Sequence, residues 1–207
     1  SIRSFRSEKV ALFISNLLEG NILEAKNLLI ELSGLYPIKI TRSLEKAKSW
    51  LRKKARGSER YGLLTTSGAY RLKPLGIFAG SIAKEKVASW FLKEKNDVRS
   101  SFALEDAATE FQVQGLELDW TGLIWDGDFI KNSKDWLYKS FEGTAWKNMD
   151  DKEKRKNKLN AYRVLLTRAR QGMIIVIPEG DPYDKTRDSE KYDPTWNYLK
   201  EVGIDVI

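Results

Sequence analysis

The sequence predicts an α/β domain in which a mostly parallel sheet is covered by helices on both faces. Residues 173–177 form an uninterrupted apolar run that Pro178 closes, and a strand apolar on both sides belongs inside a helix-covered sheet. Apolar residues recur at helical spacing in several earlier segments. A chain of 207 residues suits one such domain with a full core.

The first 41 residues predict two helices and a strand. Residues 2–19 are expected to begin extended and then to form a helix with Ser7 as its N-cap. The apolar face of this helix consists of Val10, Phe13, Ile14, Leu17 and Leu18. Residues 21–32 predict a second amphipathic helix, and residues 36–41 predict a short strand.

A third helix is expected over residues 43–56. Its outward face is basic, and Arg52, Lys53 and Lys54 form its densest group of charges. Such a group is typical either of a solvated face or of a contact with a phosphate backbone. Both interpretations remain open at this point.

The middle of the chain alternates short elements with loops. Residues 60–67 predict a strand, a loop rich in Gly and Pro follows to Gly80, and residues 83–93 predict a helix. Residues 121–125 predict another strand. Residues 131–158 are interpreted as a polar insertion, in which the charged run 150–158 is expected to be disordered.

Residues 160–177 predict a helix, a tight turn at Gly172 and a buried strand. The end of this helix is crowded with Arg163, Thr167, Arg168 and Arg170. Cations are mildly favoured at a helix C-terminus, which is one explanation. The other is that one arginine points at a phosphate. Beyond this strand we expect a polar loop over 179–192, a short helix that Asp193 caps and Gly203 ends, and a final strand.

Composition excludes several kinds of site. The chain has no histidine and no cysteine, so Ser-His-Asp catalysis, thiolate metal sites and disulfides are excluded. The first 60 residues carry all of the net charge of +7, which favours an anionic partner such as nucleic acid. Without a membrane-length apolar run or signal sequence, a cytoplasmic protein with no membrane partner is expected.

Carboxylates around residues 105–128 suggest a second kind of chemistry. Two or three of them at strand ends could hold Mg²⁺ for a nuclease, because carboxylates and water suffice for that ion. The spacing matches no nuclease signature. The candidates are Glu105, Asp106, Glu117, Asp119, Asp126 and Asp128.

Residues 162–170, Tyr-Arg-Val-Leu-Leu-Thr-Arg-Ala-Arg, resemble motif VI of superfamily 1 helicases. The longer stretch 160–181 is similar to the Schlafen group 3-like DNA/RNA helicase family. This resemblance, clear over residues 100–207 and weak over 1–20, implies a three-layer RecA-like, P-loop NTPase-type fold. It also implies that Arg168 is an arginine finger for the γ-phosphate of ATP and that Thr167 lies at the nucleotide.

Two more segments extend the resemblance. Residues 4–7, Ser-Phe-Arg-Ser, look like the Asn-Tyr-Arg-Ser segment that opens the second RecA-like domain, which implies a γ-phosphate contact by Arg6, with Arg3 as the alternative. Residues 109–119 resemble motif V. That likeness assigns Gln114, Gly115 and Glu117 to the nucleotide, with Glu117 on the ribose.

On the nucleic-acid side, motif V implies a role for Thr109. Many relatives have His where Phe111 stands, so stacking on a base or sugar is the expected substitute for a polar contact at Phe111.

No G-x-x-x-x-G-K-[ST] loop occurs in the chain. The resemblance therefore implies that residues 1–207 are a single C-terminal RecA-like motor domain, and that ATP and Mg²⁺ are bound mainly by a preceding N-terminal RecA-like domain of the same protein. We expect DNA or RNA as the partner and no ATP turnover by these residues alone. The alternatives are a nucleic-acid-binding module that uses the basic residues 39–60, and the Mg²⁺-dependent nuclease.

Overall fold

The computed structural model describes all of residues 1–207, and its centre is a six-stranded sheet. Every neighbouring pair of strands is parallel, in the order β3-β2-β4-β8-β1-β9. The predicted α/β class is confirmed, and the arrangement is consistent with a three-layer RecA-like fold. The strands are β1 (Ile38–Thr41), β2 (Tyr61–Leu64), β3 (Ala107–Ala108), β4 (Leu118–Ile124), β8 (Ala169–Val176) and β9 (Asp205–Val206).

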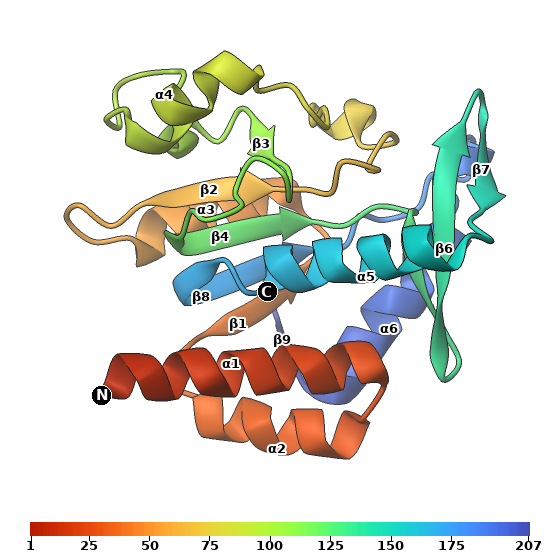
Figure 1. The fold of residues 1–207 in the computed structure, drawn as a ribbon, viewed down its shortest axis with the longest axis horizontal. Helices are drawn as coiled ribbons and strands as arrows, with labels where there is room; N and C mark the ends of the chain where they lie inside the picture. The colour runs from red at the N-terminus through yellow and green to blue at the C-terminus, as the bar shows by residue number, and fades with distance from the viewer.

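Helices cover both faces of this sheet. Figure 1 shows α1 and α5 on the near face, with α3 behind the strands. Side chains of β8 alternate between the layers: Met173 and Ile175 pack with α1, α2, α5 and α6, whereas Ile174 and Val176 pack with α3. The helices are α1 (Ile2–Glu19), α2 (Ile22–Leu32), α3 (Leu44–Lys54), α4 (Val87–Leu92), α5 (Lys152–Leu166) and α6 (Asp193–Val202).

The predicted polar insertion over 131–158 is folded. It contains most of an antiparallel sheet of β5 (Phe129–Asn132), β6 (Asp135–Glu142) and β7 (Ala145–Asn148), which stands beside the carboxyl end of β4 in Figure 1. Trp136 of this sheet is buried and stacks on Phe129, with 4.1 Å between ring centroids. The aromatic residues of the insertion thus extend the core.

The charged run 150–158 was expected to be disordered, and this prediction is wrong. Asp151 caps the start of α5 by accepting a hydrogen bond from the backbone nitrogen of Lys154 at 3.0 Å, and the run forms the first turns of that helix. Its charges face solvent except for Lys158, which pairs with the buried Asp128, and the same helix later buries Tyr162, Leu165 and Leu166. That buried half stabilises the helix from which the exposed turns extend.

The predicted turn at Gly172 is also wrong. Helix α5 ends at Leu166, and β8 begins at Ala169 and includes Gly172. A Cβ at Gly172 would lie 2.6 Å from the carbonyl oxygen of Pro37 and 2.7 Å from the Trp120 ring. Glycine is needed at this position because neighbouring chain segments approach closely.

Helix α1 is continuous from Ile2, so the predicted extended start and the N-cap at Ser7 are wrong. The hydroxyl of Ser1 instead accepts a hydrogen bond from the backbone nitrogen of Ser4 at 3.3 Å. The apolar face predicted for this helix is buried as expected. As a result, Arg3 and Arg6 lie on the first turns of a helix.

Parallel strands give the domain two distinct edges. We call the edge where β4 and β8 begin the amino edge, and the edge where they end the carboxyl edge. Helix α5 starts at the carboxyl edge and ends at the amino edge, as does the segment 109–117 that connects β3 to β4. No helix is long and apolar enough to cross a membrane.

The remaining predicted elements are found with small shifts in their bounds. The loop over 179–192 contains two short 3-10 helices, and Gly203 ends α6 in a left-handed conformation, with φ of 105°. Tyr192, not Asp193, occupies the N-cap position of α6. Three further 3-10 turns span Lys73–Leu75, Lys84–Lys86 and Ser101–Ala103.

Candidate functional site

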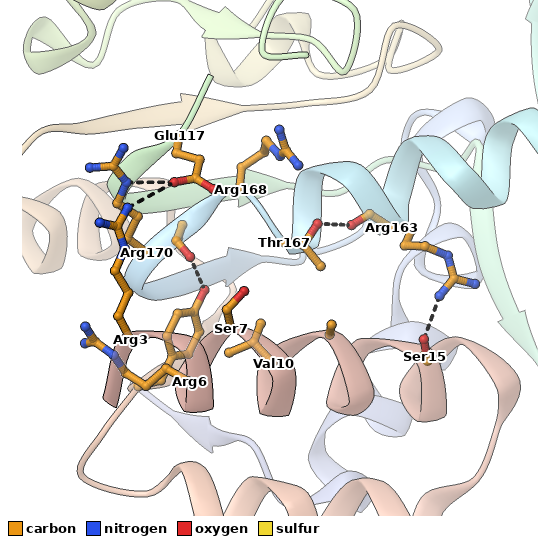
Figure 2. A pocket seen from close by; sticks show the side chains of 13 residues that line it. Arg3, Arg6, Ser7, Val10, Ser15, Glu117, Arg163, Thr167, Arg168 and Arg170 are labelled. Carbon is orange, nitrogen blue, oxygen red and sulfur yellow. Dashed lines mark hydrogen bonds and ion pairs between the residues drawn. The ribbon is translucent and has the colours of Figure 1, made fainter. Parts of the chain in front are cut away.

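A cleft of about 390 Å³ opens at the amino edge between α1 and α5. We call it the arginine cleft, because five arginines line it and Glu117 is its only carboxylate (Figure 2). The residues with charged or hydroxyl side chains that line this cleft are Arg3, Arg6, Ser7, Ser15, Tyr36, Glu117, Arg163, Thr167, Arg168 and Arg170.

Four separate segments bring these side chains together. The first turns of α1 provide two arginines, the end of α5 and the start of β8 provide three, and Glu117 comes from the segment before β4. The backbone nitrogen of Leu118 donates to the carbonyl oxygen of Arg168 at 3.3 Å. This pairing of β4 with β8 brings Glu117 and Arg168 to the same end of the sheet.

Positive charge in the arginine cleft is incompletely neutralised. Glu117 Oε2 lies 2.8 Å from Arg170 Nε and 3.8 Å from an Arg3 nitrogen, as Figure 2 shows. Arg6, Arg163 and Arg168 form no salt bridge. Figure 2 shows them spread along the cleft, with Arg163 beside Ser15 and Arg168 turned away from Arg6. Guanidinium groups without carboxylate partners can donate to an anion that has several oxygens. The arrangement therefore favours binding of a polyphosphate.

Arg168 is held by backbone carbonyl oxygens. Its Nε lies 3.2 Å from the oxygen of Val164, and one terminal nitrogen lies 3.5 Å from the oxygen of Val113 and 3.3 Å from that of Leu116. These neutral acceptors orient the guanidinium without cancelling its charge. The other terminal nitrogen has no partner in the chain and is free to donate to a phosphate oxygen.

Arg6 and Arg163 are each fixed by one polar side chain. Arg6 donates to Gln171 Oε1 at 3.3 Å, and its buried Nε has no hydrogen-bond partner. Arg163 donates to the hydroxyl oxygen of Ser15 at 2.9 Å. Arg3 is largely exposed, with 70% of its side-chain surface accessible, so Arg6 is the better-positioned of the two N-terminal candidates.

Thr167 and Gly115 lie in the two segments beside Arg168, and Thr167 lines the cleft. Thr167 occupies the C-cap position of α5, and its hydroxyl donates to the carbonyl oxygens of Arg163 at 2.8 Å and Val164 at 3.1 Å. Gly115 has φ of 81°, a left-handed conformation that favours glycine. It does not line the cleft itself, but it lies in the turn whose neighbouring carbonyl oxygens hold Arg168.

Tyr36 forms part of the wall beside this site. Its hydroxyl donates to the carbonyl oxygen of Ala169 at 3.1 Å. Burial raises the pKa of Tyr36 well above its usual value, against the smaller opposing effect of Arg6. The phenol therefore stays neutral and acts in positioning the start of β8.

Gln114 and Phe111 lie at a different place from the other motif V residues. Both line a second cleft of about 500 Å³ between α5 and the segment 109–114, which we call the amide cleft. Gln114 was predicted to bind nucleotide with Gly115 and Glu117, but it does not line the arginine cleft. Thr109 is only 4% exposed, so its side chain does not present a nucleic-acid contact at the surface.

The basic group Arg52, Lys53 and Lys54 lies apart from both clefts. It forms the last turn of α3, which packs on the opposite face of the sheet from α1 and α5. The Lys54 ammonium lies 5.8 Å from the centroid of the Trp50 ring. These three residues therefore do not form one continuous site with Phe111.

Two of the carboxylates proposed for Mg²⁺ are buried and engaged with the chain. Asp128 accepts from Tyr162 at 2.6 Å, from Lys158 at 2.7 Å and from Thr66 at 2.5 Å. Burial, and then repulsion from Asp128, raise the pKa of Asp126 to about 7.

The other candidate carboxylates do not complete a metal site. Glu117 lies at the amino edge, where Asp119 accepts a hydrogen bond from the backbone nitrogen of Arg60 at 2.8 Å. No group of three potential ligands could hold a metal ion. No site with three carboxylate ligands therefore supports the nuclease alternative, which stays a prediction for two carboxylates.

The sequence pointed to the cluster at the end of α5 but not to its full surroundings. Ser15 and Tyr36 line the arginine cleft and were not predicted, because their spacing indicates only a helix and a strand. Their place depends on how α1 and β1 pack beside α5. No local motif carries that information.

Comparison with known families adds an independent finding. A family model described as Schlafen group 3, DNA/RNA helicase domain, matches residues 1–179. The chain belongs to this family. The match includes the segments around Arg6, 109–117 and Arg168 but ends before 180–207, so the likeness expected for the tail is not part of it. No curated protein and no solved structure gives a significant match.

Proposed function

We propose that this helicase-like domain is the C-terminal RecA-like half of an ATP-dependent nucleic-acid motor. The observation that carries the proposal is the arginine cleft, where three guanidinium groups lack a carboxylate partner. A nucleoside triphosphate supplies the negative charge that such a cluster attracts. Family membership supports the same function class.

In this proposal the nucleotide lies between two domains. The chain contains no Gly-rich phosphate loop with its lysine, and no group of three or more of its carboxylates is placed to hold a metal ion. ATP and Mg²⁺ would be held mainly by an N-terminal RecA-like domain of the same protein. The present domain would add Arg168 and Arg6 to the γ-phosphate and Glu117 to the ribose.

Arg168 has the catalytic role in this account. Its free terminal nitrogen would meet the charge that develops on the γ-phosphoryl oxygens during transfer. Residues that interact with such charge act on the rate more than on ground-state binding. The carbonyl oxygens of Val113 and Leu116 would hold the side chain ready, which limits the reorganisation needed in the reaction.

The experiment is ATP hydrolysis by residues 1–207 beside the same protein extended at its N-terminus, each with and without single-stranded nucleic acid. We expect turnover only from the extended form, with stimulation by nucleic acid. Hydrolysis by residues 1–207 alone would contradict this division of the site. An extended form that never hydrolyses ATP would contradict the motor itself.

A second candidate function is a nucleic-acid-binding module without motor activity. The observation that favours it is the basic group Arg52, Lys53 and Lys54, which is exposed or half-buried and forms no salt bridge. Such a module would bind oligonucleotides in a salt-dependent manner. Binding would survive replacement of Arg168 and fall when the three basic residues are replaced by glutamine.

A further inference from the structure

The amide cleft has a chemistry unlike that of the arginine cleft. Its walls are one side of α5, from Lys154 to Val164, and the segment 109–114. Its volume of about 500 Å³ is sufficient for one nucleotide, since small-molecule sites commonly measure about 300–1,000 Å³. Its lining combines one aromatic ring, carboxamides and amines.

Phe111 is the aromatic ring of this cleft. It is 74% exposed although it is large and apolar, and it takes part in none of the aromatic pairs of the core. An exposed ring beside a cleft offers a face on which a base can stack. Each such stack contributes about 1–3 kcal/mol in single-stranded nucleic-acid complexes.

Three carboxamides surround the same space. Gln114 comes from the segment before β4, and Asn157 and Asn160 come from one face of α5. All three are exposed, and none forms a hydrogen bond within the chain. A carboxamide both donates and accepts, which is the pattern that the edge of a nucleobase requires.

The face of α5 that lines the cleft differs from the rest of its exposed half. Around it the helix carries Lys152, Glu153, Arg155 and Lys156, all exposed. Toward the cleft it presents two lysines, Lys154 and Lys158, together with the two asparagines and the short side chains of Ala161 and Val164, which leave room for a planar group. The amides and small residues are what set this face apart from the charged positions around it.

Of the three charged side chains that line the amide cleft, only one is available to a phosphate. Lys158 donates to buried Asp128 at 2.7 Å, and Glu110 accepts from the backbone nitrogen of Ser67 at 2.8 Å, so both are engaged within the chain. Lys154 forms no salt bridge and remains available to a backbone phosphate.

From this geometry we infer that the amide cleft binds a single unpaired base of a nucleic-acid strand. The base stacks on Phe111, its edge is read by Gln114, Asn157 and Asn160, and Lys154 contacts a neighbouring phosphate. Binding by this domain therefore depends on base identity. The inference rests on the proposed function, because it takes nucleic acid as the partner, and it adds a sequence preference to it.

The test uses residues 1–207 and fluorescently labelled single strands of about twelve nucleotides, each a homopolymer of one base, with binding followed by anisotropy at fixed salt. We expect affinities for the best and the worst base to differ about fivefold or more. The double variant N157A/N160A should remove that difference and leave the affinity for the worst base within about twofold. Both positions are exposed on a helix, where alanine is favourable, so folding should be retained.

Two further variants separate the inference from simpler explanations. N27A/N197A changes two exposed asparagines on α2 and α6, outside both clefts, and should preserve the base preference. F111A should weaken binding of every homopolymer, because stacking needs only a π-face.

Equal affinities for all four homopolymers, or a preference that persists in N157A/N160A, would overturn recognition of the base by the amide cleft. Neither result would contradict nucleic-acid binding by the domain. Absence of binding by both residues 1–207 and the N-terminally extended protein, together with ATP turnover that nucleic acid does not stimulate, would overturn this inference and the proposed nucleic-acid motor together.

Discussion

Glu117 accepts a hydrogen bond from Nε of Arg170 at 2.8 Å, and it is the only carboxylate that faces the five arginines of the arginine cleft. This carboxylate lies beside guanidinium groups that a phosphate would also bind. In the proposed function the same side chain accepts from the ribose. The carboxylate of Glu117 should therefore weaken binding of a bare polyphosphate and strengthen binding of a ligand that carries a ribose.

Replacement of Glu117 by glutamine separates these contributions. E117Q should bind inorganic tripolyphosphate about two- to fivefold more tightly, because a negative charge that competes for Arg170 is removed. ATP should gain less than tripolyphosphate, because its ribose loses a charged acceptor. Isothermal titration of the N-terminally extended protein with both ligands measures the ratio.

E105Q is the matched control, since Glu105 is exposed and lines neither main cleft. Its affinities should equal those of the wild type. An equal gain in affinity for both ligands would contradict the contact between Glu117 and the ribose. Weaker binding of tripolyphosphate by E117Q would contradict competition between Glu117 and phosphate for Arg170.

Replacement of Gly172 tests how closely β8 packs against the neighbouring segment at Pro37. In G172A a new Cβ would lie 2.6 Å from the Pro37 carbonyl oxygen, and backbone cannot move aside as a flexible side chain can. We expect the free energy of unfolding to fall by about 2–3 kcal/mol, measured by urea denaturation. G34A should cost only about 1 kcal/mol, from its left-handed backbone, because nothing lies within 4 Å of its added Cβ. A smaller loss for G172A than for G34A would contradict the packing described.

The buried carboxyl group of Asp126 should make the free energy of unfolding depend on pH. This carboxyl is fully buried and accepts from the Tyr192 hydroxyl at 2.8 Å and the Arg71 backbone nitrogen at 2.9 Å. Burial and Asp128 raise its pKa to about 7, so the folded state retains a proton that the unfolded chain releases near about pH 4. The folded state therefore binds more protons over this interval, and its stability falls as pH rises from about 4 to about 7.

The contribution of this one group is at most about 1.4 kcal/mol per pH unit. Urea denaturation at about pH 5 and about pH 7 measures it. D126N cannot ionise, so its loss of stability between these two values should be smaller than that of the wild type, whatever its absolute stability. An unchanged difference would assign the pH dependence to other groups.

Much of the fold could be predicted from sequence because local signals agreed with the tertiary structure. The apolar run before Pro178 is buried between two helix layers, and the apolar face of α1 is buried as its spacing indicated. Gly172 misled the prediction because glycine both ends helices and permits close packing of strands. The reason for glycine at this position is Pro37, which is 135 residues away in the chain.

The candidate site was predictable only where a motif lies within one segment. Arg168 and Glu117 were named through the resemblance to motifs VI and V, and the structure places both in the lining of the arginine cleft. Gln114 is only three residues from Glu117, yet it lines the other cleft, because the chain crosses from one edge of the sheet toward the other over that segment. Asn157 was missed because it lies in the charged run 150–158 that was expected to be disordered, and Asn160 was predicted only as the start of a helix.

The most direct test of the account is replacement of Arg168 by alanine in the N-terminally extended protein. Arginine fingers elsewhere contribute about 10³ to 10⁵ in rate, or roughly 4–7 kcal/mol, whereas an exposed arginine contributes almost nothing. We therefore expect R168A to reduce ATP turnover at least about a hundredfold and to leave nucleotide affinity within a few-fold.

R99A is the control, because Arg99 pairs only with Asp97 and its side chain is 56% exposed. It should leave turnover unchanged. Circular dichroism of R168A should show a folded domain, since the bonds it loses to carbonyl oxygens are long. A large loss of turnover with retained ATP binding is the predicted result, and normal turnover by a folded R168A protein would contradict the central claim.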